Sequence, residues 1–246
     1  MSQEVYFIVL TEQRSGSTYL GSLLNQHPEI LFGGELFLQQ QHPGCWIMTD
    51  NIAVDEVIGG DFSSFVGFRG LTKPLDTIRA KGFVIHGHQA ASRLADFEKI
   101  SNIKDLKVIN LVRQNSLARH VSQLVAAKTN AYQKTAETED QKPTVWVNYN
   151  NLLNDMNTIK DRKNHFRSYF KTDSILDITY EDITDNPKES LKKIYNFLHL
   201  PVTEQSLVTD THIKKQETRS LSEVVDNFSS IKQLLTEAGY SWAQNL

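Results

Sequence analysis

The stretch "VYFIVLTEQRSGSTYLGSLL", residues 5–24, constrains the fold more than any other part of the chain. Its first six residues are apolar and typical of a buried strand, and the segment from residue 19 is typical of a helix. Amides in a tight turn and in the first turn of a helix have no partner within the helix, so they point outward together and attract an anion. The stretch therefore predicts an α/β unit with an oxyanion site after its first strand.

The side chains of the connecting loop suit an anion. Gly16 allows the backbone to approach a ligand closely, and Arg14 adds a planar, permanently charged guanidinium. Hydroxyl donors come from Ser15, Ser17 and Thr18. The alternative interpretation of so short a motif is an ordinary loop in which a Ser or Thr side chain caps the following helix.

The common phosphate loop G-x-x-x-x-G-K-[ST] does not fit this stretch. It requires Gly at position 11 and Lys at position 17, where the chain has Thr11 and Ser17. The cation here precedes the glycine by two residues instead. A loop for the phosphates of ATP or GTP is therefore disfavoured.

Composition limits the remaining function classes. The chain has 246 residues, of which 39% are hydrophobic and 22% charged, and this predicts one α/β domain over residues 1–246. A formal net charge of −3, with basic residues spread along the chain, gives no general reason to bind nucleic acid. One cysteine, Cys45, excludes an internal disulfide, and we expect no metal site.

Targeting signals are missing from the sequence. The N-terminal apolar run is too short for a signal peptide and has no basic segment before it. No stretch approaches the roughly 20 apolar residues that a transmembrane helix needs. We therefore predict a cytoplasmic protein without a transmembrane segment.

Strand and helix patterns alternate along the rest of the chain. Strands are predicted over residues 82–89, 106–113 and 174–179, and helices over residues 71–81, 92–100, 116–128, 147–170 and 187–200. Alternation of this kind favours a central parallel sheet flanked by helices. Ligands of such sheets lie at the carboxyl ends of the strands, where Arg14, His88 and Arg113 are expected.

The loop "QRSGSTYL" closely resembles the corresponding loop of sulfotransferases that use 3′-phosphoadenosine 5′-phosphosulfate (PAPS). The resemblance implies a P-loop-like three-layer sandwich. In this family the loop holds the 5′-phosphosulfate. The resemblance therefore implies this role for Arg14, Ser15, Gly16, Ser17, Thr18 and Tyr19.

A second anion site is implied by "LVRQNSLARHVSQLVAAKT". In the family, an Arg at this strand end and a Ser in the following helix bind the 3′-phosphate, which suggests Arg113 and Ser122. Ser122 lies one residue further from Arg113 than is usual, so Arg113 is the better match. In isolation, Arg113 and Arg119 are better interpreted as solvated or ion-paired arginines at a helix end, whereas in combination with the first loop the anion-binding interpretation is favoured.

Two later segments extend the resemblance. "TYEDITDNPKESLKKIYNFLHLP" is similar to a family pattern, and "IKKQETRSLSEVVDNFSSIKQLL" resembles the C-terminal segment whose basic loop closes over the nucleotide. Lys215 and Arg219 are the candidate nucleotide contacts in that loop. Together with "GGELF", these segments are most similar to bacterial carbohydrate sulfotransferases of the trehalose and Nod-factor type.

The resemblance implies transfer of a sulfuryl group from PAPS to an acceptor hydroxyl, on a carbohydrate or glycolipid, giving 3′,5′-bisphosphoadenosine (PAP). Arg14 would offset charge on the leaving phosphate, and family enzymes generally need no metal. Glu35 in "FGGELF" is the preferred base and His88 the second candidate. If the strand continues past His86, this residue shares a face with His88, and the pattern does not choose between them.

Two other functions stay open on the sequence. A small-molecule P-loop kinase shares the architecture but should carry a Walker lysine and a Mg²⁺-binding carboxylate, and neither is evident. A non-catalytic relative that binds PAP is the other alternative. Binding without turnover would identify it.

Overall fold

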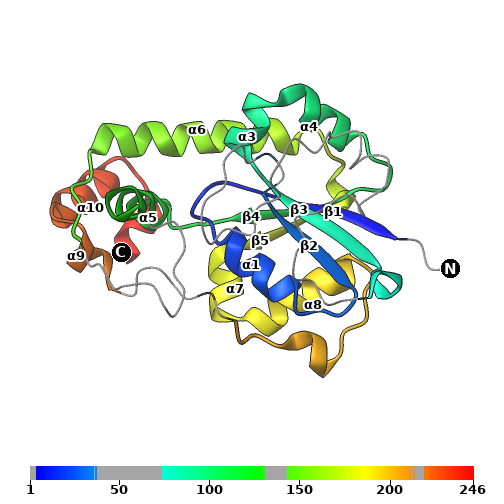
Figure 1. The fold of residues 1–246 in the computed structure, drawn as a ribbon. Coiled ribbons are helices and arrows are strands. Elements are labelled where there is room, and N and C mark those ends of the chain that lie inside the picture. Colours follow the sequence, from blue (N-terminus) through cyan, green and yellow to red (C-terminus); the bar gives the residue numbers. More distant parts are fainter. Residues whose placement is uncertain (1–3, 36, 38–73, 131–142, 212, 214–218) are drawn as a thin grey trace.

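A five-stranded parallel sheet is the centre of the molecule in the computed structural model, which describes residues 4–35, 37, 74–130, 143–211, 213 and 219–246 (Figure 1). The strand order is β2-β3-β1-β4-β5. The strands are β1 Val5–Thr11, β2 Ile30–Glu35, β3 Ala80–His86, β4 Lys107–Val112 and β5 Ile175–Thr179. All neighbouring pairs run parallel, so the carboxyl ends of the five strands share one edge.

Helices cover both faces of this sheet (Figure 1). One face packs against α1 Ser17–Leu24, α7 Tyr180–Asp185 and α8 Pro187–Phe197. The other packs against α3 Gly87–Ser92, α4 Leu94–Ser101 and the end of α6 Tyr149–Arg167. Phe7, Ile8, Val9 and Leu10 of β1 are buried in succession because a parallel strand with helices on both faces is apolar throughout.

A third group of helices lies beyond the carboxyl edge of the sheet, at the left of Figure 1. It comprises α5 Ser116–Thr129, α9 Leu221–Val224, α10 Phe228–Glu237 and the start of α6, which share their own apolar cluster. The remaining turns of helix are of the 3-10 type: η3 Leu75–Thr77, η4 Thr172–Ser174, η5 Glu204–Leu207 and η6 Ser241–Asn245.

The predicted fold class is confirmed: a parallel sheet lies between two helical layers. Strand β2 was not predicted, and two assignments around β3 are wrong. Ala80 and Lys81, placed in a helix by the sequence, are the first residues of β3. That strand ends at His86, and Gly87 begins α3, so His88 belongs to a helix and the strand alternation that linked it to His86 does not apply.

Within the described residues, no helix combines the length and the apolar character that crossing a bilayer requires.

Candidate active site

The loop after β1 forms a cradle at the carboxyl edge of the sheet. Arg14 and Gly16 both adopt left-handed backbone conformations, with φ angles of 65° and 88°. Gly16 is the N-cap of α1 and has no side chain to occupy the amides of the first helical turn. Those amides and their partial positive charge are therefore presented to a ligand.

Tyr180 lies against this loop and explains why residue 16 is a glycine. A Cβ at Gly16 would stand 2.5 Å from Cδ2 of Tyr180. The Tyr180 ring also contacts Arg113, whose guanidinium carbon lies 4.5 Å from the ring centre. Tyr180 therefore packs against both the loop and the second predicted anion-binding residue.

Arg113, Arg14 and Ser122 meet although they are distant in sequence. Nη1 of Arg113 donates to the carbonyl oxygen of Arg14 at 3.1 Å, and Nε of Arg14 donates to Oγ of Ser122 at 3.1 Å. Burial lowers the pKa of Arg113, while Tyr180 and Glu181 oppose the shift. The structure thus brings the loop arginine and both predicted 3′-phosphate residues together.

Glu181 fixes the start of α5. Its carboxylate accepts from the amides of Gln114 and Asn115 at 3.1 and 3.2 Å. Asn115 caps α5 through Oδ1, which accepts from the amide of Ala118 at 2.8 Å. The segment that carries Arg113 into α5 is therefore held by two side chains.

Glu35 lies at the end of β2, next to the end of β3. Its Oε2 accepts from Nε2 of Gln89 at 2.7 Å and stands 3.5 Å from Nδ1 of His86. Nε2 of His86 lies 3.4 Å from Oγ of Ser17, at the first position of α1. A chain of polar groups thus connects the preferred base to the cradle.

His88 lies on α3 beside the loop. Its Nε2 is 3.3 Å from Nε2 of Gln13. Burial lowers the pKa of His88 to about 4, helped by His86 and Arg162 and opposed by Glu35. Its imidazole is therefore neutral at pH 7 and a weaker proton acceptor than an exposed histidine.

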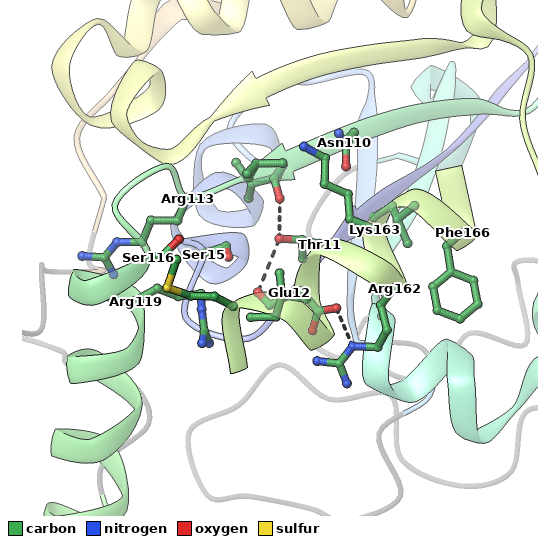
Figure 2. Close-up of a pocket in the computed structure, with 16 residues that line it drawn as sticks. Thr11, Glu12, Ser15, Asn110, Arg113, Ser116, Arg119, Arg162, Lys163 and Phe166 are labelled. Atoms are coloured by element: carbon green, nitrogen blue, oxygen red, sulfur yellow. Dashed lines mark hydrogen bonds and ion pairs between the residues drawn. The ribbon is translucent and has the colours of Figure 1, made fainter. Parts of the chain in front are cut away.

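A pocket with about 560 Å³ of empty space lies between the ends of β1 and β4 and the helices α5 and α6 (Figure 2). Residues of the loop, cationic side chains and apolar side chains of α6 contribute to its lining. The lining residues labelled in Figure 2 are Thr11, Glu12, Ser15, Asn110, Arg113, Ser116, Arg119, Arg162, Lys163 and Phe166. The pocket therefore joins the cradle to the surface of α6.

Glu12 is the acidic group in this pocket. Its Oε1 lies 3.0 Å from Nε of Arg162 on α6. Burial raises the pKa of the Glu12 carboxyl to about 7, while the charges of Arg162 and Arg119 act to lower it. Arg119 forms an ion pair with Asp155 of α6 and donates to the carbonyl oxygen of Gln13 at 3.4 Å. The pair of Glu12 with Arg162 therefore holds α6 against the end of β1, and the pair of Arg119 with Asp155 holds α5 against α6.

The other predicted residues lie at the borders of the site. Thr18 and Tyr19 are half-buried on α1, and burial, followed by the neighbouring Tyr180, raises the pKa of Tyr19. Arg219 precedes α9 and donates to the carbonyl oxygen of Pro143 at 3.0 Å. Lys215 lies outside the described residues.

Sequence reasoning did not assign roles to Gln89, Glu12, Tyr180 or Glu181. Tyr180 and Glu181 belong to the "TYED" segment whose family resemblance was noted, so the motif carried a usable signal. Gln89 and Glu12 had none, because their partners, Glu35 at the end of β2 and Arg162 on α6, are distant in the sequence. Among the described residues, no group of three or more His, Cys, Asp or Glu side chains could hold a metal ion.

Together, the fold and the loop define a class of α/β proteins in which a helix without a side-chain cap starts at the carboxyl edge of a parallel sheet. The family model "Sulfotransferase domain" matches residues 6–234, and the chain belongs to this family. The family predicted from the loop motif is thereby confirmed.

Relatives in sequence cover nearly the whole chain. Nodulation protein H of Rhizobium tropici is 26% identical over 235 residues, which cover 96% of this chain and 91% of that protein. Nodulation protein H of Rhizobium meliloti is 23% identical over 236 residues, with coverages of 96% and 93%. The similarity therefore extends beyond the loop motif.

Solved structures show the same fold. A sulfotransferase from Alicyclobacillus acidocaldarius has a TM-score of 0.51 and 12% identity, covering 96% of this chain and 93% of that chain. The sulfotransferase domain of the Synechococcus PCC 7002 olefin synthase has a TM-score of 0.51 and 16% identity, with coverages of 94% and 84%. At these identities the likeness concerns the fold alone.

Proposed function

We propose that this sulfotransferase transfers a sulfuryl group from PAPS to an acceptor hydroxyl and releases PAP. The observation that carries the proposal is the cradle: Gly16 leaves the first amides of α1 without a side-chain cap, and Arg113 contacts Arg14 of the same loop. Two arginines and a helix N-terminus suit a donor that bears several phosphate and sulfate oxyanions.

The donor contacts divide between two groups of residues. The loop from Arg14 to Tyr19 would hold the 5′-phosphosulfate, and Arg113 with Ser122 would hold the 3′-phosphate. The bond between Arg14 and Ser122 supports this division, because it places the two groups side by side. Lys215 and Arg219 would close over the nucleotide.

Glu35 is the proposed base. Its carboxylate would take the proton of the acceptor hydroxyl while that oxygen bonds to sulfur and the bond from sulfur to the 5′-phosphate oxygen breaks. Arg14 and the amides of α1 would offset the charge that grows on the phosphate. His88 is the second candidate: burial lowers its pKa to about 4, so it lacks the near-neutral pKa that makes histidine the better base at pH 7.

A carbohydrate or glycolipid hydroxyl is the proposed acceptor. This follows from the resemblance to carbohydrate sulfotransferases of the Nod-factor type, and the similarity to nodulation proteins H supports it. No metal has a role in the proposed reaction, and a cytoplasmic location stays a prediction of the sequence.

Calorimetric titration with PAP, AMP and ATP tests the donor site. We expect PAP to bind most tightly and Arg113→Ala to weaken it about 10- to 100-fold, the effect of losing a hydrogen bond to a charged group. Arg79→Ala is the matched control, because Arg79 precedes β3 at the opposite edge of the sheet and pairs with Glu29. It should leave PAP binding unchanged.

Two outcomes would contradict the proposal. Tighter binding of ATP with Mg²⁺ would favour a kinase. PAP binding without transfer from labelled PAPS to oligosaccharide acceptors would instead indicate a non-catalytic relative.

A further inference from the structure

Gln89 and His86 form the connection between the proposed base and the anion cradle. Both are buried, with exposed fractions of 5% and 3%. They belong to the junction of β3 and α3, where His86 is the N-cap and Gln89 is the third helical residue. A buried polar group is costly unless its hydrogen bonds are made, so the partners of these two side chains matter.

The Gln89 amide uses both of its ends. Its Oε1 accepts from the backbone amide of His86 at 3.2 Å, and its Nε2 donates to Oε2 of Glu35 at 2.7 Å. The first bond fixes which end of the amide is oxygen, so the N–H must face Glu35. An N–H donor at this distance stabilises the ionised carboxylate and limits its orientation.

His86 stands between the carboxylate and the cradle. Nδ1 is 3.5 Å from Oε2 of Glu35, and Nε2 is 3.4 Å from Oγ of Ser17. Burial, together with the charge of Arg14, lowers the pKa of His86 to about 4, so its ring carries one proton at neutral pH. That proton can face Glu35 or Ser17 but not both.

We propose that Gln89 and His86 are positioning residues for sulfuryl transfer, Gln89 by holding the Glu35 carboxylate and His86 by linking it to Ser17. Nδ1 lies 3.5 Å from Oε2 of Glu35 without a hydrogen bond to it. A proton on Nδ1 would therefore let His86 donate to the carboxylate only after a small approach, while Nε2 accepts from the Ser17 hydroxyl. With the proton on Nε2, it donates to Ser17, whose hydroxyl is then available to an anion in the cradle. This inference rests on the proposed function, because Glu35 is its base.

Among the described residues, five charged or titratable side chains surround this junction. Arg14 faces His86 from the loop, Glu35 faces it from β2, and His88 faces it from α3, with ring centroids 5.6 Å apart. Arg162 of α6 acts on His88.

Glu12, at the end of β1, lies against Gly87 of α3, and burial raises its pKa to about 7. Because Glu12 titrates in every variant, a shift of the acid limb is measured relative to the wild type. Every variant below leaves Arg14, His88 and Arg162 in place.

Gln89→Leu tests the first half of the proposal through the pH dependence of kcat/KM for sulfuryl transfer. Loss of a donor to the carboxylate favours its protonated form, so the acid limb should move about one pH unit higher. Gln26→Leu is the matched control: the Gln26 amide also donates at 2.7 Å, to the carbonyl oxygen of Asp210 beyond the end of α1. Gln26→Leu should leave the acid limb of the pH profile of kcat/KM unchanged.

His86→Asn and His86→Gln test the second half. An Asn amide reaches the position of Nδ1 and a Gln amide reaches that of Nε2, so each variant retains one contact. His86→Asn should keep the acid limb and raise KM for PAPS about tenfold, the effect of one lost hydrogen bond. His86→Gln should show the opposite pattern, a shifted limb with nearly unchanged KM.

Failure of this inference differs from failure of the proposed function. Glu35→Gln should bind PAP normally and lose transfer, and retained transfer would remove Glu35 as the base. If Glu35→Gln is inactive but Gln89→Leu lowers the rate equally at all pH values, or if both His86 variants change KM and the limb together, only the positioning role is wrong. Melting temperatures identify any variant that fails to fold, and the remaining variants then decide.

Discussion

Gly16 and Gly239 share a left-handed backbone but differ in their surroundings. Their φ angles are 88° and 83°. A Cβ at Gly16 would collide with the Tyr180 ring, whereas a Cβ at Gly239 would meet no atom within 4 Å. The pair therefore separates the backbone penalty of a side chain from the penalty of a clash in the cradle.

Gly239→Ala should lower the free energy of unfolding by about 1 kcal/mol, the cost of a left-handed alanine. Gly16→Ala should lower it by about 2–4 kcal/mol, because Tyr180 must also move. Since Tyr180 packs on Arg113, Gly16→Ala should weaken PAP binding as well. Urea denaturation and calorimetry measure both effects. Equal losses of unfolding free energy in the two variants would show that the Tyr180 ring moves aside without a measurable free-energy penalty.

Candidate site residues were predictable where they are contiguous in sequence. The loop from Arg14 to Tyr19 forms a recognisable motif on its own, and Arg113 follows an evident strand. Gln89 was not predictable, because its role depends on the register of β2 beside β3 and on the strand's end at His86. Such contacts are set by sheet packing rather than by local pattern.

The central elements were predictable for a similar reason. Strand β1 is apolar up to Thr11, β4 is apolar apart from Lys107 and Asn110, and α8 begins at Pro187 and buries one apolar face. Strand β2 was missed because Gly33 and Gly34 interrupt its apolar pattern, and its register shifts between Phe32 and Glu35. Of the predicted helix over residues 71–81, the first three residues lie outside the described residues, Leu75–Thr77 form a 3-10 turn, and Ala80 and Lys81 pair with β1 as the start of β3.

Glu12 connects the end of β1 to α6 through Arg162, and its titration makes the stability of the fold depend on pH. In the folded protein the Glu12 carboxyl has a pKa of about 7, because burial disfavours its charge, against an ordinary value of 4.5. Between pH 4.5 and 7 the folded protein therefore binds more protons than the unfolded chain. The contribution of Glu12 to stability falls as pH rises through this range, by about 3 kcal/mol in all.

Glu12→Gln removes this titration. We expect the unfolding free energy of the variant, minus that of the wild type, to rise between pH 4.5 and 7 and to level off above pH 7. The difference is needed because His86 and His88, whose pKa values burial lowers to about 4, stabilise the fold increasingly over the same rise in pH. Chemical denaturation at several pH values measures it. A flat difference would mean that Glu12 ionises normally.

At the scale of the whole molecule, the C-terminal segment joins the helical cluster beyond the sheet edge to the start of α6. Nδ2 of Asn227 donates to the carbonyl oxygen of Val147 at 2.9 Å, and Oδ1 of Asn227 accepts from the Val147 amide at 3.0 Å. Val145 pairs with Val225 next to these bonds. One side chain thus fixes the segment that follows Arg219 against the segment that leads into α6.

Asn227→Leu keeps the approximate volume but removes both bonds, leaving the backbone groups of buried Val147 without these partners. We expect the free energy of unfolding to fall by about 2–3 kcal/mol. Asn102→Leu is the matched control: the exposed Asn102 amide donates to the carbonyl oxygen of Glu98 at 2.9 Å, and its loss should change stability by less than about 0.5 kcal/mol.

PAP affinity of the same variants tests whether the C-terminal segment reaches the nucleotide. If Lys215 and Arg219 close over the donor as proposed, releasing their anchor at Asn227 should weaken PAP binding several-fold, because ordering the segment then opposes binding. Gly239→Ala controls for lost stability without a loosened anchor and should bind PAP normally. Unchanged affinity in Asn227→Leu, despite its lower stability, would show that the nucleotide is held without this segment.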